Sequence, residues 1–281
     1  MVVRVLPDLA RPRAAAARRG RSQAKTARLG RADLHVHSVA SDGTATVDEI
    51  LRFAEERTEL DVIAVTDHER IDAALHARDL AEQRGLRVQV VVGEEVTTRS
   101  GHLLALFLSE RVRPLRSLRS TIIEIHEQGG LAIPAHPLPL YPLCIRRGAI
   151  ESITADPDER LYFDGLETFN ASTAGRTHHR PAVELAGRLH LAAIGGSDAH
   201  HVSLIGRCWT TFPGHTPDDL KQAIARGQTH AHGDFYGLPL EAWVYTHQLR
   251  KYVRDIRDDL RRAVLRRGRG RDLGIGEGPS S

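Results

Sequence analysis

Short apolar runs alternate with amphipathic helical patterns along the middle of this chain. The apolar runs predict strands at Leu34–His37, Val62–Thr66, Val88–Val92, His102–Leu108, Leu131–Ala135, Gly165–Thr168 and Leu191–Ile194. The helical patterns predict helices near Thr46–Arg57, Asp72–Arg84, Leu118–Gln128 and Pro181–Leu189. Strands that alternate with helices in this way are typical of a parallel sheet or barrel, so the predicted fold class is α/β.

Polar residues with ligand chemistry occur where these predicted strands end. Leu34 and Val36 alternate with His35 and His37, so a strand places both imidazoles on one face. The later strands carry or are followed by Asp67-His68, Glu94-Glu95, His136, Glu167 and Asp198-Ala199-His200. One such residue is usually a helix cap. Their repetition at strand ends that meet at one mouth instead predicts a convergent metal site.

The remaining segments divide the chain into a central domain with two flanks. Residues 137–163 are expected to form a loop or short helices over the mouth, and Cys208–Phe212 and Pro217–Gly227 a further strand and helix. A charged helix with an apolar stripe is predicted at 246–271; it either docks on the body or contacts nucleic acid. The predicted domains are a basic arm at 1–31, a barrel at 32–246, and a basic helix and tail at 247–281.

Composition and charge narrow the class of protein. With 41% hydrophobic and 27% charged residues, the chain has an ordinary globular composition. No apolar run approaches the ~20 residues of a membrane span. Two cysteines give no disulfide framework, which favours a reducing, cytoplasmic setting. Residues 1–31 carry a net charge of +8 and 247–281 a net charge of +5, which leaves −10 for the segment between them. An acidic body with basic flanks suits a protein that concentrates cations and contacts polyanions through its tails.

The order of the short motifs supplies a resemblance. DLHVHS, SDG, TDH, GEE, GHLLAL, AHP and GSDAH, in this order, resemble the polymerase and histidinol phosphatase (PHP) superfamily, and the resemblance spans about residues 32–232. The resemblance implies a distorted seven-stranded β/α barrel with two or three divalent metal ions at its mouth. It also implies hydrolysis of phosphoesters as the commonest activity.

The resemblance also implies a set of ligands, motif by motif. The first metal would be held by His35, His37 and Asp198, and the second by His102 and His136, with Glu94 bridging the two. A third would be held by the set Asp42, His68 and His200. Imidazole and carboxylate ligands without thiolate suit Zn, Mn or Fe without choosing among them. We expect Glu95 to point to the opposite face of the strand from Glu94, so that replacing Glu95 costs far less activity.

Three residues outside this set are expected to support the centre. Asp67 is expected either to orient His68 or to cap the following helix. Arg176 and Arg207 are the preferred candidates to bind substrate phosphate, because they follow predicted strand ends. Weaker candidates for the same role are Arg99, Arg146, Arg147, His178 and His179.

The predicted function is hydrolysis of a phosphomonoester, such as a nucleotide, a sugar phosphate or a nucleic-acid end, through a metal-bridging hydroxide. Only residues 103–135 separate the GHLLAL and AHP motifs, where relatives that act on bisphosphorylated nucleotides insert a lid. This spacing indicates an open mouth. Two alternatives remain: a polyanion-binding or complex-associated module that works through its basic tails, and a metallohydrolase with a non-phosphate substrate.

Overall fold

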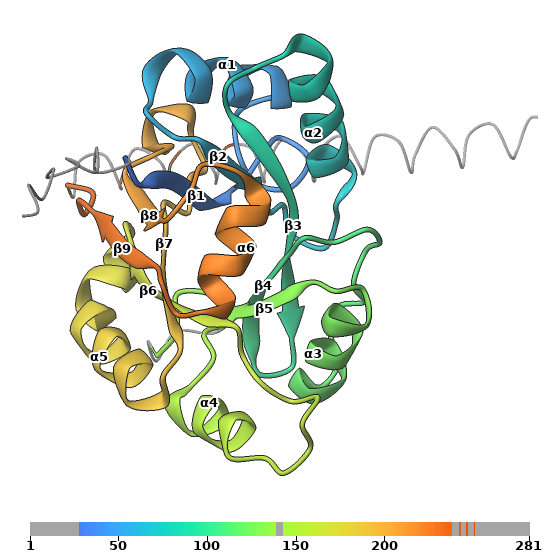
Figure 1. The fold of residues 1–281 in the computed structure, drawn as a ribbon, viewed down its shortest axis with the longest axis vertical. Helices are drawn as coiled ribbons and strands as arrows, with labels where there is room; N and C mark the ends of the chain where they lie inside the picture. Colours follow the sequence, from blue (N-terminus) through green and yellow to red (C-terminus); the bar gives the residue numbers. More distant parts are fainter. Residues whose placement is uncertain (1–27, 139–142, 238–241, 243–245, 247–249, 251–281) are drawn as a thin grey trace, which may run out of the picture.

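The computed structural model describes residues 28–138 and 143–237, together with 242, 246 and 250. Figure 1 shows a curled sheet with most of the helices packed around its outside and one helix, residues 217–225, across its centre. The strands are β1 Gly30–Val36, β2 Val62–Val65, β3 Gln89–Thr98, β4 Gly101–Leu106, β5 Leu131–Pro134, β6 Gly165–Asn170, β7 Ala192–Gly196, β8 Cys208–Phe212 and β9 His230–Gly233. The helices are α1 Val47–Arg57, α2 Asp72–Arg84, α3 Leu118–Glu127, α4 Arg147–Thr154, α5 Thr173–Leu189 and α6 Pro217–Ala225.

The strands form one large sheet and one small one. The large sheet has seven strands in the order β5-β4-β3-β2-β1-β8-β9, and β6 pairs with β7 in the second sheet. β1, β2 and β3 run parallel, whereas β4 forms an antiparallel hairpin with β3. β6 packs against β5, and β7 packs against β8 and β9, so the small sheet fills the gap between the two ends of the large one. The α/β class and the seven-stranded, barrel-like sheet predicted from the sequence are thus confirmed.

Two apolar cores hold the sheet in its curled shape. The inner core lies on the concave side, where residues such as Leu34, Ala64 and Leu104 meet Leu220 and Ile224 of α6. α6 therefore fills the interior of the curled sheet. The outer core lies between the strands and the surrounding helices and includes most of the buried residues of α1, α2 and α3. Burial on both faces explains why these strands read as nearly continuous apolar runs.

The helix ends follow local sequence signals. Thr46 caps α1 in a capping box with Glu49, and Thr216 does the same for α6 with Asp219. α2 ends at Gly85, whose positive φ of 60° suits a residue without a side chain. These short-range signals fix where each helix begins or ends, and therefore where the next strand can start.

Some elements differ from their predicted bounds. β3 continues six residues beyond the predicted end at Val92, because it forms a hairpin with β4 as far as Thr98. α5 begins at Thr173 rather than Pro181, and β9 is an additional edge strand. Most of 246–271 and all of 1–27 fall outside the described residues, so the predicted basic arm and terminal helix keep their status as predictions. No helix in the described part combines the length and hydropathy that crossing a membrane would require.

Candidate metal centre

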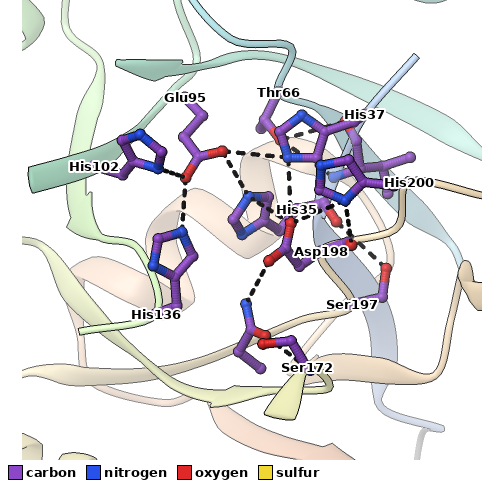
Figure 2. Close-up of polar contacts among 12 residues, drawn as sticks. His35, His37, Thr66, Glu95, His102, His136, Ser172, Ser197, Asp198 and His200 are labelled. Carbon is purple, nitrogen blue, oxygen red and sulfur yellow. Dashed lines mark hydrogen bonds and ion pairs between the residues drawn. The ribbon is translucent and has the colours of Figure 1, made fainter. Parts of the chain in front are cut away.

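Histidine and carboxylate side chains from separate strand ends meet at one edge of the sheet (Figure 2). Among the described residues they form three groups in which the candidate ligand atoms lie within 4.8 Å of one another. The groups are His35, His37 and Asp198; His68, Glu95 and His102; and His37, Asp42, His68 and His200. The convergence expected from the sequence is present, and every predicted ligand except Glu94 lies at this centre.

Glu95 lies in the middle of the centre, and its two carboxylate oxygens face different imidazoles. Oε1 lies 2.8 Å from Nδ1 of His102 and 2.9 Å from Nε2 of His136. Oε2 lies 3.2 Å from Nε2 of His35 and 3.3 Å from Nε2 of His37, and 3.4 Å from Nδ1 of His68. A carboxylate placed in this way can bridge two metal ions.

Asp198 supplies the second carboxylate of the centre. Its Oδ1 lies 3.5 Å from Nε2 of His35 and 3.4 Å from Nε2 of His37. The backbone at Asp198 has a φ of 54°, a conformation that a non-glycine residue adopts only where its surroundings hold it there. Asn170 helps to hold it, because the Asn170 side-chain amide donates to the other carboxylate oxygen at 3.3 Å.

Asp42 reaches the centre from the turn that follows β1. Its Oδ2 lies 3.0 Å from Nε2 of His200, and its Oδ1 lies 3.6 Å from Nδ1 of His37. The Asp42 side chain is 45% exposed, whereas the side chains of His35 and His37 are fully buried. The group around Asp42 is therefore the part of the centre most open to solvent.

The electrostatics of the centre favour bound positive charge. Burial opposes protonation of His37, yet Asp198, Glu95 and Asp42 outweigh it and raise the His37 pKa to about 10. His35 shows the same balance, and its pKa is raised well above the ordinary value. Burial would raise the pKa of Glu95 and of Asp198, but the surrounding imidazoles hold both pKa values well below their usual range. Raised pKa values of the imidazoles beside carboxylates with lowered pKa values mark a centre that attracts positive charge, such as that of a metal ion.

The residues present fit divalent metal ions. Both ring nitrogens of His37 and Nδ1 of His102 are buried and lack a hydrogen bond of acceptable geometry, although carboxylate oxygens lie nearby. Buried nitrogens without hydrogen-bond partners are costly unless another ligand satisfies them. The donor set of imidazole nitrogens and carboxylate oxygens matches the preferences of Zn, Mn and Fe.

The assignment of Glu94 as the bridging ligand was wrong. Glu94 points away from the histidines, and its Oε2 accepts a hydrogen bond from the backbone N–H of Val112 at 2.8 Å. Because β3 continues through both glutamates, their side chains lie on opposite faces of the strand, as expected. The face that carries the histidines, however, receives Glu95 and not Glu94. A parallel bridge between His68 and Glu95 fixes this register, and the sequence pattern does not reveal such a pairing.

Glu167 is a supporting residue to which the sequence analysis gave no role. It is buried, and its Oε1 lies 2.9 Å from Nδ1 of His35, the ring nitrogen that faces away from Glu95. Its Oε2 accepts hydrogen bonds from the backbone N–H of His136 and, at 3.1 Å, from Asn170. Glu167 thus orients the His35 imidazole, a role that is common for carboxylates behind metal-binding histidines, and it also holds the backbone of His136. The sequence feature that could have indicated this role is its position in a predicted strand near the end that meets the centre.

Asp67 has a different partner from either of those expected. Its carboxylate accepts hydrogen bonds from the Ser38 backbone at 2.8 Å and from the hydroxyls of Ser38 and Ser41 at 2.6 and 2.5 Å. Asp67 therefore holds the turn that carries Asp42, and it neither orients His68 nor caps α2. Asp67 thus supports the loop beside the histidines and not the histidines themselves.

The two preferred arginines lie away from the centre. Arg176 lies on α5 rather than on a loop; its guanidinium donates to the backbone carbonyl of Tyr236 and lies 5.3 Å from the Phe235 ring. Arg207 is exposed and lines a separate cavity together with Arg31, Trp209 and other residues. Neither placement supports the phosphate-binding role predicted for them. His179 on α5 contacts the Thr168 carbonyl at 2.8 Å instead of the centre.

Comparison with known proteins gives a consistent classification. A family model described as the PHP domain matches residues 33–133, and a model described as PHP-associated matches residues 176–229. The uncharacterized protein MJ1587 of Methanocaldococcus jannaschii is 35% identical over 164 residues, which cover 54% of this chain and 85% of that protein.

Two further proteins extend the comparison. A phosphoribosyl 1,2-cyclic phosphate 1,2-diphosphodiesterase of Eggerthella lenta is 37% identical over 98 residues, 33% of this chain and 36% of that enzyme. Among solved structures, a two-domain protein of Bacteroides vulgatus containing a predicted PHP-like metal-dependent phosphoesterase superimposes with a TM-score of 0.60 at 20% identity. That match covers 79% of this chain and 70% of the other, and it shows that the two share a fold.

Proposed function

This chain belongs to the PHP family, and from that premise we propose that it is a metal-dependent phosphoesterase. The observation that carries the proposal is the position of Glu95, whose two oxygens face separate sets of imidazoles. This arrangement suits two adjacent metal ions that share one carboxylate, with the more exposed group around Asp42 available for a third. The metals are Zn, Mn or Fe, as the donor set indicates.

Each part of the chain has a definite task in this proposal. Bound divalent ions would lower the pKa of water and offset negative charge on the phosphoryl group. His35, His37 and Asp198 would hold one ion, and His102 and His136 the other, while Glu95 would contribute an oxygen to each. Glu167 lies 2.9 Å from Nδ1 of His35, so Nε2 is the ring nitrogen that would be left to hold a metal ion. The buried side of the centre excludes bulk water, and the open side around Asp42 admits substrate.

We propose a phosphomonoester as the substrate, with a phosphodiester as the second candidate. The group around Asp42 is the most exposed part of the centre, which suits the approach of a small monoester from solvent. The diester candidate is supported by the Eggerthella lenta relative, whose name identifies a diphosphodiesterase and which matches over 98 residues, 33% of this chain. Contact of the basic tails with a polyanion, and a non-phosphate substrate, are the remaining hypotheses.

A metal-replacement assay tests the proposal. The full chain is stripped with a chelator, reloaded with Mn²⁺, Zn²⁺ or Fe²⁺, and assayed with p-nitrophenyl phosphate and bis(p-nitrophenyl) phosphate. We expect no turnover without metal, recovery with at least one ion, and faster hydrolysis of the monoester. Faster hydrolysis of the diester would favour the second candidate. A fully metal-loaded protein that hydrolysed neither compound, nor any member of a phosphoester panel, would refute the proposed activity.

A further inference from the structure

A cysteine thiol lies behind one of the predicted metal ligands. Sγ of Cys144 lies 3.4 Å from Nδ1 of His136, whereas Nε2 of the same ring lies 2.9 Å from Oε1 of Glu95. Figure 2 shows this ring directed toward Glu95. Cys144 is a free cysteine and is buried. Its thiol therefore contacts the ring nitrogen of His136 that does not face Glu95.

The backbone that carries Cys144 is held against the same pair of predicted ligands, His102 and His136. The Leu143 carbonyl accepts the backbone N–H of His102 at 2.7 Å. A Cβ at Gly101 would lie 2.6 Å from the carbonyl carbon of Cys144, so this segment lies directly against the start of β4. One segment thus holds the backbone of His102 and contacts the ring of His136. These backbone contacts do not involve the thiol, so a small replacement at this position leaves them in place.

Other histidines of the centre have an oxygen atom where His136 has this sulfur. Nδ1 of His35 lies 2.9 Å from the Glu167 carboxylate, and Nδ1 of His200 lies 3.0 Å from the backbone carbonyl of Asp198. A metal-bound imidazole usually donates its second N–H to an acceptor of this kind, which fixes the tautomer and the orientation of the ring. A thiol sulfur is a weak acceptor, but it can serve the same purpose.

An independent observation points to a ligand between His102 and His136. Nδ1 of His102 is buried and lacks a hydrogen bond of acceptable geometry, and it lies 2.8 Å from the same oxygen of Glu95 that faces His136. A buried nitrogen without a partner is costly unless another ligand satisfies it. The two imidazoles and this carboxylate oxygen therefore suit one bound ion, and Cys144 supports that group from outside it.

We propose that Cys144 is a positioning residue for the metal ion that His102 and His136 would hold. The Nδ1–H of His136 donates to Sγ, which leaves Nε2, the nitrogen that faces Glu95, to hold the ion. Cys144 itself contacts neither the ion nor the substrate. The inference rests on the proposed metal centre, and it adds a residue outside the predicted ligands that controls how tightly one ion is bound.

Metal affinity measured on cysteine variants tests this role. The full chain is stripped with a chelator and titrated with Zn²⁺ in a calorimeter, with metal content checked by mass spectrometry. We expect Cys144→Ala to weaken the binding of one ion by about 10- to 100-fold and to leave the affinity for the others within about 2-fold. Cys144→Ser keeps a hydrogen-bonding atom and should bring the affinity back to within about 3-fold of the wild type.

Cys208→Ala is the matched control. Cys208 is the other cysteine of the chain, it is also buried, and within the described residues no hydrogen bond joins its thiol to a candidate ligand. Its replacement removes the same atom from the interior and should leave the affinity for every ion within about 2-fold. Equal weakening in Cys144→Ala and Cys144→Ser, or the same weakening in Cys208→Ala, would show that Cys144 only fills space and would overturn the proposal.

Cobalt absorption separates a positioning residue from a metal ligand. A thiolate that is bound to Co²⁺ gives an intense charge-transfer absorption in the near ultraviolet, because it is a soft, electron-rich ligand. We expect the cobalt-loaded wild type to lack this absorption. A band that disappears in Cys144→Ala would identify the thiol as a direct ligand and would refute the positioning role.

These measurements need no substrate, so they separate this inference from the proposed activity. If the metal-loaded protein hydrolyses no phosphoester, the proposed function fails, yet a loss of affinity for one ion that serine restores would still establish the role of Cys144. Unchanged affinity for every ion in Cys144→Ala would exclude that role, whether or not the protein is active.

Discussion

At the scale of single residues, the metal centre depends most on Glu95. This carboxylate lies within 3.4 Å of nitrogens from five imidazoles, and its side chain is almost fully buried. A buried carboxylate in such surroundings is stable only when positive charge compensates it. The same compensation, supplied by metal ions, would make Glu95 the bridge between two sites.

We predict that Glu95→Gln removes metal and activity together. The amide keeps the shape of the side chain but loses the negative charge and one of the two coordinating oxygens. Metal content by mass spectrometry should fall by at least one ion per chain, and turnover by at least ~100-fold. Glu94→Gln is the control and should keep its metal. A Glu95 variant with wild-type metal content and rate would show that another residue bridges the ions.

Glu94 gives a prediction about pH and stability. Burial raises the pKa of Glu94 to about 7 from its ordinary 4.5, with Val112 and Arg111 opposing the shift. The folded protein therefore holds a proton that the unfolded chain releases between these values. This contribution to stability is complete below pH 4.5 and is lost as the pH rises through 7, on the order of 2–3 kcal/mol.

Urea unfolding of the chelated wild type and Glu94→Gln at pH 5 and pH 8 measures this effect. The wild type should lose more free energy of unfolding between the two pH values than the variant, by the amount given above. Both proteins contain the same histidine cluster, so the contribution of its titration cancels when the wild type is compared with Glu94→Gln. Equal losses would mean that the carboxyl does not titrate in this range.

The ligand types could be predicted from the sequence, but the register of one strand could not. Two histidines that are two residues apart in a strand must share a face, because side chains alternate between the faces of a strand. Aspartates that follow apolar runs are likewise recognisable as residues at strand ends. Glu94 and Glu95 are adjacent, so either could point inward. The choice depends on a bridge from β3 to His68, which is a contact between distant parts of the chain. The role of Glu167 likewise follows only from its distance to His35 in space.

At the scale of elements, the turn after β1 delivers Asp42 to the centre. A Cβ at Gly43 would lie 2.4 Å from the His37 carbonyl oxygen and 2.8 Å from that of Ser38, both of them backbone atoms. The close approach therefore requires glycine at this position. Asp67 holds the same turn through Ser38 and Ser41, so two independent features fix the position of Asp42.

We predict that Gly43→Ala displaces this turn and weakens the group of ligands around Asp42. Metal titration should show loss of the weakest-bound ion, with turnover lower by about 10-fold. Gly187→Ala is the matched control, because a Cβ there meets nothing within 4 Å inside α5. That substitution should stabilise the helix by about 0.5–1 kcal/mol. Unchanged metal binding in Gly43→Ala would show that the turn can shift without moving Asp42.

Elements were easiest to predict where local signals mark both ends. The bounds of α1 match closely because a capping box starts it and its apolar face repeats regularly. The extension of β3 and the early start of α5 depend instead on pairing with β4 and on a serine cap ahead of Pro181. β9 is short and polar, and its pairing with β8 holds it in place. Tertiary contacts set the bounds of β3 and β9, which local patterns cannot report, whereas the Ser172 cap of α5 is a local signal that the sequence analysis did not use.

At the scale of the whole molecule, the described body contains every candidate ligand between His35 and His200. The body is also tied to residues just outside this range. Arg28 pairs with Asp61 at 2.6 Å, and Tyr236 bonds through its hydroxyl to the Ser197 carbonyl, next to Asp198. A self-sufficient catalytic body therefore has to include residues 28–237.

We predict that a chain shortened to residues 28–246 keeps its metal and hydrolyses p-nitrophenyl phosphate within about 3-fold of the full rate. The removed segments hold the basic excess of the chain, so they are expected to affect polyanion binding and not catalysis. Binding of a single-stranded oligonucleotide should become weaker and less dependent on salt, because fewer phosphate contacts release fewer counterions. Circular dichroism verifies folding of the shortened chain. A folded but inactive body would show that a removed segment completes the active site, and unchanged salt dependence would place the polyanion contact on the body itself.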